Sequence, residues 1–93
     1  EHPLFSDIVD DKVMMWYKVY KLGDSQDWHT HDGVKSCGTR FLKLPKKSGK
    51  LCFKGWNQQN VEHTQIEFTS KDKHRVTTNQ SDDYRITISW NVV

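Results

Sequence analysis

The last eleven residues, Asp83–Val93, carry the most regular pattern in the chain. One parity is apolar and the other is polar: Tyr84, Ile86, Ile88, Trp90 and Val92 alternate with Arg85, Thr87, Ser89 and Asn91. Because successive side chains of a strand point to opposite faces, this pattern predicts a strand with its apolar face buried and its polar face in water. It constrains the chain to a β-rich fold and predicts that Trp90 lies near the centre of the core.

Five further segments have the composition of β-strands: residues 13–22, 39–44, 50–56, 64–69 and 74–78. The first is apolar on both parities, which predicts a central strand covered on both faces. The second and third flank a turn that contains Pro45 and Gly49, so we expect them to pair as a hairpin. No helical periodicity is present. We therefore predict an all-β fold, a six-stranded antiparallel β-sandwich of two small sheets.

The length of 93 residues predicts one domain, residues 1–93, in which residues 1–12 are an N-terminal extension. Only 34% of the residues are hydrophobic, but four Trp, three Tyr and four Phe are among them. Each aromatic side chain can bury about 150–250 Å², which is enough to build a small core. No apolar run approaches the roughly 20 residues that span a bilayer, so we expect no membrane partner.

Two features favour a secreted protein. Asn79 begins an Asn-Gln-Ser sequon and is a candidate for glycosylation, and the two cysteines, Cys37 and Cys52, can form one disulfide. A flat hairpin would hold these cysteines about 20 Å apart, whereas a disulfide needs Cα atoms about 4.4–6.8 Å apart. The bond therefore requires a bend near Gly38. Two free buried thiols are the alternative, but secretion favours the disulfide.

Positive charge is concentrated in the middle of the chain. Residues 33–61 contain seven Lys and Arg and no acidic residue, although the net charge of the chain is only +2. We expect the basic hairpin to bind an acidic patch on a partner protein, with five lysines as its contacts: Lys43, Lys46, Lys47, Lys50 and Lys54. Nucleic acid is a less favoured partner, because such a small net charge is unusual for a nucleic-acid-binding domain.

His29 and His31 are weak candidates for a metal site. Two histidines at i and i+2 of an extended segment point the same way and can share Zn²⁺ or Cu²⁺. A third protein ligand is needed, and the sequence does not show whether His63, His74 or a carboxylate supplies it. We favour a polar loop with solvated histidines, and we predict no metal and no cofactor.

An enzyme is the less favoured functional class. A ribonuclease-like site needs a base, an acid and a cation for the phosphate, which Glu62 or Glu67, His63, His74 and Arg75 could supply. The sequence contains no nucleophile motif and no glycine-rich phosphate loop. We therefore predict no catalytic residues.

The succession of short strands from Val13 to Val93, a length near ninety residues and two cysteines resemble the MAX effectors, the avirulence and ToxB-like proteins of plant-pathogenic fungi. The resemblance rests on architecture and not on a shared motif. It implies two packed three-stranded sheets and a non-enzymatic virulence factor that binds host proteins and is detected by immune receptors. The family's disulfide starts in the first strand, where this chain has no cysteine.

The predicted function is that of a secreted, monomeric, non-enzymatic module that binds a protein partner. A partner strand can extend a sheet at an exposed edge, where backbone groups are unpaired. The short polar segment 74–78 is the predicted edge strand, with five contact residues: His74, Arg75, Val76, Thr77 and Thr78. The basic hairpin is the second predicted contact surface.

Overall fold

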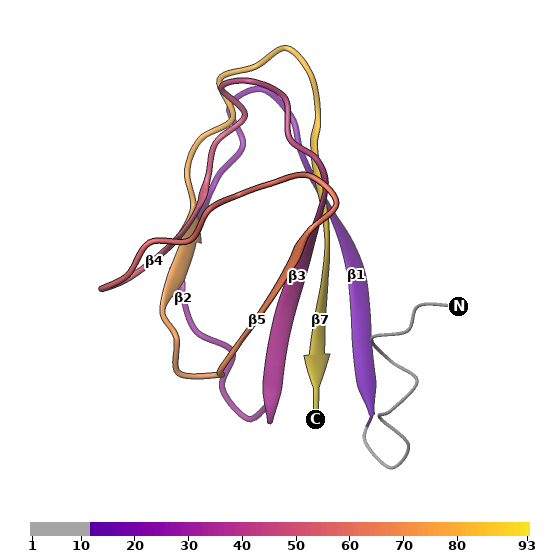
Figure 1. Ribbon diagram of the computed structural model, residues 1–93, viewed down its shortest axis with the longest axis vertical. Coiled ribbons are helices and arrows are strands. Elements are labelled where there is room, and N and C mark those ends of the chain that lie inside the picture. Colours follow the sequence, from indigo (N-terminus) through magenta and orange to yellow (C-terminus); the bar gives the residue numbers. More distant parts are fainter. Residues whose placement is uncertain (1–11) are drawn as a thin grey trace.

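The computed structural model describes residues 12–93, which form seven β-strands and no helix. The strands are β1 Val13–Tyr20, β2 Gln26–His29, β3 Ser36–Lys43, β4 Leu51–Phe53, β5 Gln65–Phe68, β6 His74–Val76 and β7 Arg85–Val92. They build two antiparallel sheets that face each other, with the orders β1-β7-β3-β5 and β2-β6-β4 (Figure 1). The prediction of an all-β antiparallel sandwich is confirmed. The unexpected seventh strand is β2, a segment interpreted from the sequence as a polar loop.

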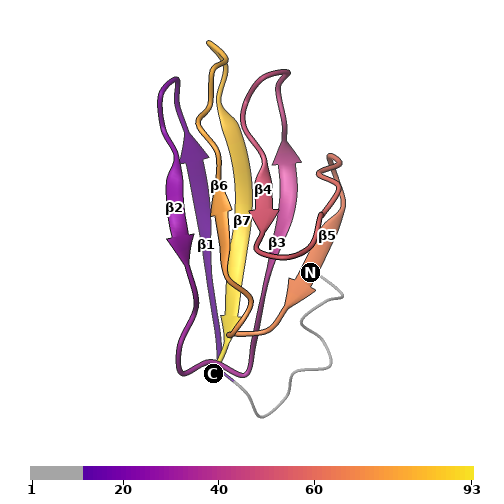
Figure 2. The ribbon, with the colours of Figure 1, turned by 90° about the vertical axis from the view of Figure 1, so that its left-hand side faces the viewer.

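The chain changes sheets at every connection, because odd-numbered strands lie in the four-stranded sheet and even-numbered strands in the other (Figure 2). No two consecutive strands therefore pair, and the predicted hairpin of residues 39–44 and 50–56 is wrong. β3 pairs with β5 and β7, whereas β4 pairs with β6. The segment between β3 and β4 crosses from one sheet to the other. At its end Gly49 has a φ of +92°, and a Cβ there would lie 2.2 Å from the carbonyl oxygen of Thr77.

Two strand positions differ from the prediction. β1 is an edge strand that pairs only with β7 among the described strands, and much of its surface is exposed, so it is not a central covered strand. β6 was predicted as an edge but lies between β2 and β4, with both of its sides paired. A short polar strand can occupy the centre of a sheet because its backbone bonds do not depend on side-chain polarity.

The faces of β7 are the reverse of the prediction. Arg85, Thr87 and Ser89 are 1–4% exposed and face the second sheet, whereas Ile86 and Ile88 are half-buried on the outer face. The polar side chains are tolerated between the sheets because they find partners there. The hydroxyl groups of Thr39 and Ser89, for example, lie 2.8 Å apart and share a hydrogen bond.

Trp90 is buried but does not belong to the central core cluster. Its ring covers Gly38 of the neighbouring strand, where an added Cβ would approach the indole to 2.2 Å. Between the sheets the core is instead formed by seven buried side chains: Tyr20, Cys37, Phe41, Leu51, Phe53, Phe68 and Val76. Among residues 12–93 there is no helix of the length and apolarity needed to cross a membrane.

The predicted disulfide is wrong, because both cysteines are free thiols. Cys37 is buried in β3 between the sheets, and its thiol donates to the carbonyl oxygen of Phe68 at 3.5 Å. Cys52 lies in β4 of the other sheet, between the buried residues Leu51 and Phe53, so its side chain points to the opposite face. The strands that carry the thiols are not neighbours, which is the physical reason that no bond forms.

The predicted glycosylation of Asn79 does not fit the fold. The side chain is 0% exposed, and its amide nitrogen donates to the carbonyl oxygens of Tyr20 and Asp83, both at 2.9 Å. A glycan on this nitrogen would replace one of these donors and would require space that the buried site lacks. Asn79 instead holds the β6–β7 connection against the end of β1.

The predicted N-terminal extension, residues 1–12, lies outside the described residues except for Lys12. The carbonyl oxygen of Lys12 accepts a hydrogen bond from the backbone N–H of Val93 at 2.9 Å. This bond continues the β1–β7 ladder by one residue beyond the end of β7.

Candidate metal centre

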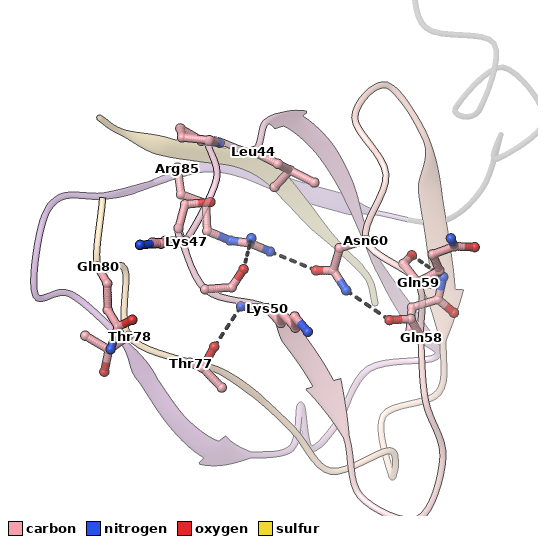
Figure 3. Close-up of a pocket in the computed structure, with 13 residues that line it drawn as sticks. Leu44, Lys47, Lys50, Gln58, Gln59, Asn60, Thr77, Thr78, Gln80 and Arg85 are labelled. Carbon is pink, nitrogen blue, oxygen red and sulfur yellow. Dashed lines mark hydrogen bonds between the residues drawn. The ribbon is translucent and has the colours of Figure 1, made fainter. Parts of the chain in front are cut away.

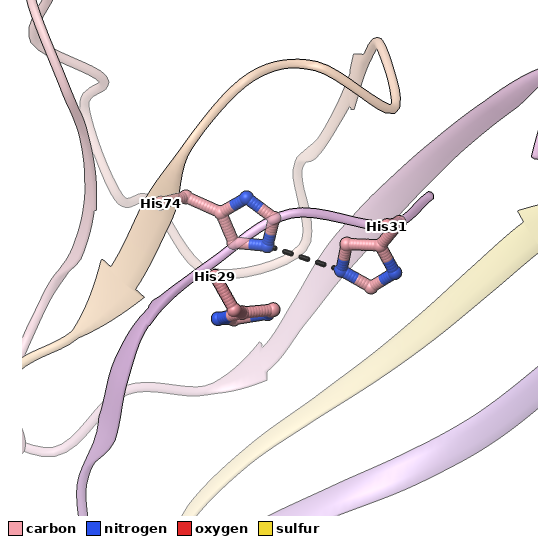
Figure 4. A group of neighbouring side chains, drawn as sticks. All are labelled: His29, His31 and His74. Atoms are coloured by element: carbon pink, nitrogen blue, oxygen red, sulfur yellow. Dashed lines mark hydrogen bonds between the residues drawn. The ribbon is translucent and has the colours of Figure 1, made fainter. Parts of the chain in front are cut away.

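Three histidines meet at the end of the three-stranded sheet (Figure 4). His29 ends β2 and His74 begins β6, and the two are direct partners in the ladder that joins these strands. His31 follows two residues after His29, and the ring centroids of these two residues lie 5.1 Å apart. The prediction that His29 and His31 point the same way is confirmed. The favoured interpretation was a polar loop with solvated histidines, whereas His29 ends a strand and both rings are half-buried.

The spacing of the ring nitrogens fits a transition metal. The available ligand atoms of the three histidines all lie within 4.8 Å of one another. The Nε2 atoms of His31 and His74 are 3.2 Å apart. Two nitrogen ligands about 2.0–2.1 Å from a tetrahedral Zn²⁺ lie about 3.3 Å from each other, so this pair already has the required separation.

Backbone carbonyl groups fix the tautomers of two rings. The Nδ1–H of His29 donates to the carbonyl oxygen of Asp27 at 2.9 Å, and that of His74 donates to Asp72 at 2.8 Å. A carbonyl oxygen only accepts, so Nδ1 of each ring carries the proton and Nε2 of the neutral ring carries a lone pair. In metal sites, hydrogen bonds of this kind from the ring nitrogen that does not bind the metal orient the histidines.

His29 differs from His31 and His74 in what its Nε2 atom contacts. The Nε2 atom of His29 is buried and has no hydrogen-bond partner. In the metal-free protein Nε2–H of His31 donates to the bare Nε2 of His74. Asn91 lies beside His31 and interacts with its ring. The side-chain oxygen of Asn91 is buried and makes no hydrogen bond of good geometry. A proton moved to Nδ1 of His31 would therefore face this amide.

Burial favours the neutral forms of His31 and His74. His74 is 2% exposed and packs against Phe53 and Phe68, with ring centroids 5.5 and 4.7 Å away. Burial lowers the pKa of His74 to about 4, and the neighbouring His29 and His31 act in the same direction. Burial is also the main reason that the pKa of His31 is lowered. Neutral imidazole is the form that binds metal ions.

No acidic side chain belongs to the cluster within residues 12–93. The carboxylate of Asp27 accepts from the backbone N–H of Trp28, and that of Asp72 accepts from the backbone N–H of Thr69. Lys18 is close enough for its charge to lower the pKa values of His31 and His74. The site therefore offers three neutral nitrogen ligands beside one cation.

The ribonuclease-like residues are not assembled. The carboxylate of Glu62 accepts from the backbone N–H of Leu44 at 2.7 Å, and His63 is exposed in the connection before β5. Arg75 is exposed and stacks on Trp28 at 4.9 Å, whereas its neighbour His74 is buried on the other face of β6. Of the predicted edge residues, His74 and Val76 are buried.

The predicted basic surface is divided by the fold. Lys43 pairs with Asp83 at 2.8 Å, and Lys47 and Lys50 line a cleft. Lys46 and Lys54 are exposed and do not line it. The five lysines therefore lie in three different surroundings: one in an ion pair, two in the cleft and two outside it.

The third histidine was the functional residue that sequence reasoning did not assign. His74 lies 43 positions after His31, and only the pairing of β2 with β6 brings them together. The sequence signal was the pair His29 and His31, which identified two of the three candidate ligands. No protein-family model matches the chain, and no curated protein matches its sequence.

Proposed function

We propose that the protein is a non-enzymatic module that binds one Zn²⁺ ion through Nε2 of His29, His31 and His74. The observation that carries the proposal is the buried Nε2 of His29, which has no hydrogen-bond partner and belongs to a ring that packs beside two further imidazoles. A buried polar atom without a partner is costly, and a metal ion supplies the missing interaction. Three histidines leave a fourth position for water or for a ligand from a partner.

The donor set selects the class of metal. Imidazole nitrogen suits Zn²⁺ and Cu²⁺, whereas Mg²⁺ and Ca²⁺ prefer oxygen ligands. Cu²⁺ generally binds a given nitrogen site more tightly than Zn²⁺, so it is the expected competitor. Mg²⁺ is the matched negative control.

Calorimetric titration of the purified protein with Zn²⁺ tests the proposal. We expect one ion per chain and a rise in melting temperature, because a ligand of the folded state contributes about 2.7 kcal/mol of stability at 100 times its Kd. The variants H29A and H31A remove half-buried ligands, and each should lower the affinity at least tenfold. H74Q removes the buried ligand while keeping a polar side chain.

His63→Ala is the control, because His63 is exposed and lies outside the cluster. It should leave the Zn²⁺ affinity unchanged. Absence of a 1:1 complex, or equal losses in H63A and H31A, would overturn the proposal. Binding of Mg²⁺ with similar affinity would contradict the assignment of nitrogen ligands.

We also propose protein binding by strand addition, the function predicted from the sequence and implied by the resemblance to MAX effectors, with β1 as the edge. Met14, Met15, Tyr17 and Val19 are 48–68% exposed on a strand that has one paired side among the described strands. Unpaired backbone groups next to apolar side chains favour an extended strand of another protein as the occupant.

Selection from a displayed library of extended peptides tests this second function. The expected binders are apolar, and Y17K should abolish their binding while V61K, an exposed apolar position outside β1, should not. Equal effects of the two substitutions would exclude β1 as the site. Concentration-dependent dimers in sedimentation would show that a second copy occupies the edge instead.

A further inference from the structure

A cleft of about 740 Å³ opens at the end of the sandwich away from the histidines (Figure 3). Three connections form it, and the first residue of β7, Arg85, lines it. The connections contribute residues 44, 45, 47–50, 58–60, 77, 78 and 80. Its size falls within the range of about 300–1,000 Å³ that is typical of small-molecule sites.

The charged residues that line the cleft all have the same sign. Of the thirteen lining residues, three are cationic and none is acidic: the cations are Lys47, Lys50 and Arg85. Nearby acids are engaged elsewhere, since Asp83 pairs with Lys43 and Glu62 accepts from the backbone N–H of Leu44. Most of the remaining lining residues carry amide or hydroxyl groups. The cleft therefore attracts anions and offers them hydrogen bonds.

Arg85 is the unusual member of the lining, because its side chain is 1% exposed and has no acidic partner. Nη1 donates to the carbonyl oxygen of Gly49 at 2.8 Å, and Nη2 donates to Oδ1 of Asn60 at 3.0 Å. Its Nε is buried without a partner. Burial lowers the pKa of Arg85, and the only charge-related neighbours are Tyr20 and Cys52.

Neutral partners do not compensate this charge. A buried cation is costly unless a counter-charge accompanies it, and an arginine fork matches the oxygens of phosphate and sulfate. Oδ1 of Asn60 already accepts from the backbone N–H of Leu51 at 2.8 Å, so it serves two donors at once. The guanidinium group therefore lies at the inner end of the cleft with N–H groups to spare.

The wall of the cleft is held by hydrogen bonds between its connections. The backbone N–H of Lys50 donates to Oγ1 of Thr77 at 2.8 Å, and the N–H of Thr77 donates to the carbonyl oxygen of Lys50 at 2.9 Å. The N–H of Gln80 donates to Lys47 at 2.8 Å. These bonds position both lysines before a ligand arrives, which lowers the entropic cost of binding.

We infer that the cleft binds a small organic ester of a tetrahedral oxyanion, a phosphate or sulfate monoester. The oxyanion lies between Arg85 and the two lysines. The amide groups of Gln58, Gln59 and Gln80 face the polar groups of the organic part of the ester. A bare anion would fill only a small part of the volume, so the organic group contributes to affinity. This site is separate from the histidine cluster and does not depend on the metal-binding proposal.

Titration of ¹⁵N-labelled protein with glucose 6-phosphate tests the inference, with glucose, inorganic phosphate and glucose 6-sulfate as parallel probes. We expect saturable shifts of the backbone N–H signals of residues 47–50 and 77–80. Glucose alone should give none, and inorganic phosphate should bind more weakly. The stronger of the two esters identifies the oxyanion.

Two double variants of equal charge provide the matched comparison. K47Q/K50Q removes the exposed cations of the cleft and should weaken binding of the preferred ester at least tenfold in 0.15 M salt. K46Q/K54Q removes two exposed lysines outside the cleft and should change the affinity less than twofold. Equal losses in the two variants, or no saturable shift with either ester, would overturn the inference.

Discussion

The two ends of the sandwich bury nitrogen-bearing side chains that differ in protonation. At one end, Nε2 of His29 and of His74 carries a lone pair, because Nδ1–H of each ring donates to a backbone carbonyl group, and burial lowers the pKa of His74. At the other end, Arg85 presents only N–H groups and remains a cation. Among residues 12–93, neither cluster contains an acidic side chain.

A buried nitrogen selects the kind of ligand it binds according to whether it carries a proton. A lone pair without a donor is complemented by a metal cation, whereas an N–H without an acceptor is complemented by an anion. Burial is common to both ends and strengthens both preferences, because electrostatic interactions are less screened there. The predictions below separate the two ends.

The largest expected difference is in thiol reactivity. Cys37 lies at the histidine end, where it is the register partner of Asn91 in the β3–β7 ladder. Its side chain is 1% exposed, and burial raises the pKa of its thiol to about 11. At pH 8 only about one in a thousand such thiols is ionised, and the thiolate is the reactive form. Cys52 is half-buried beside Lys50. Iodoacetamide should therefore modify Cys52 at least 100-fold faster than Cys37.

Intact-mass measurement counts the adducts. We expect one adduct on the folded protein, two after denaturation, and none on folded C52S. Two adducts formed at similar rates would show that Cys37 is accessible. A mass two hydrogens lower, without alkylation, would reveal the disulfide that the structure excludes.

The second prediction is that damage at one end leaves the other end unchanged. H29A combined with H31A should lower the Zn²⁺ affinity at least 100-fold and leave the affinity for the phosphate or sulfate ester within twofold. K47Q/K50Q should show the reverse pattern. Substitutions at distant sites that share no partners usually have additive effects on free energy. Calorimetry of each variant with each ligand measures the four values, and a loss at both ends would indicate a general change in the fold.

The sequence was sufficient to predict the fold class, because the alternation of β-branched and aromatic residues along a strand is a local pattern. It was insufficient for the orientation of β7, because the partners that permit a polar inner face come from other strands. Thr39 lies 50 positions before Ser89, and Gly49 lies 36 positions before Arg85. The pattern of β7 alone favours the apolar face as the buried one, and these long-range hydrogen bonds reverse it.

The candidate site shows the same limit. His29 and His31 were recognised because they are close in sequence, and their shared direction follows from strand geometry. The position of His74 depends on β6 being central, and the short polar sequence of β6 predicted an edge. The alternation of strands between the sheets has no local signal, so the cleft at Arg85 was equally hidden.

The third prediction concerns the pH dependence of stability in the metal-free protein. The folded pKa of His74 is about 4, below the ordinary value of 6.5, so between these values the unfolded chain binds more protons. The contribution of His74 is complete above pH 6.5 and is lost as the pH falls towards 4, by at most about 3 kcal/mol. Urea unfolding with a chelator at pH 7 and pH 4.5 measures it.

H74Q supplies the comparison for this effect, because glutamine does not titrate. The variant should lose much less stability than the wild type over the same pH interval. An equal loss in both proteins would assign the pH dependence to other groups. A stability that increases on acidification would contradict the neutral, buried state of the ring.

The smallest predicted effect tests whether charge also distinguishes the ends. Lys18 donates to Oε1 of Gln26 at 2.6 Å, and burial lowers its pKa to about 8, so it remains mainly charged at pH 7. Its charge opposes a metal ion at His31 and His74 by an energy on the order of 1 kcal/mol. K18M should therefore tighten Zn²⁺ binding about three- to tenfold at pH 7.

Lys21→Met is the control, because Lys21 is exposed and is not among the groups that shift the histidine pKa values. It should change the Zn²⁺ affinity less than twofold. The gain from K18M should also shrink at pH 8.5, since the wild-type lysine is then largely neutral. A gain that is independent of pH would mean that Lys18 acts through packing against the sheets. The histidine end would then select its cation by lone pairs alone, whereas the Arg85 end selects its anion by charge.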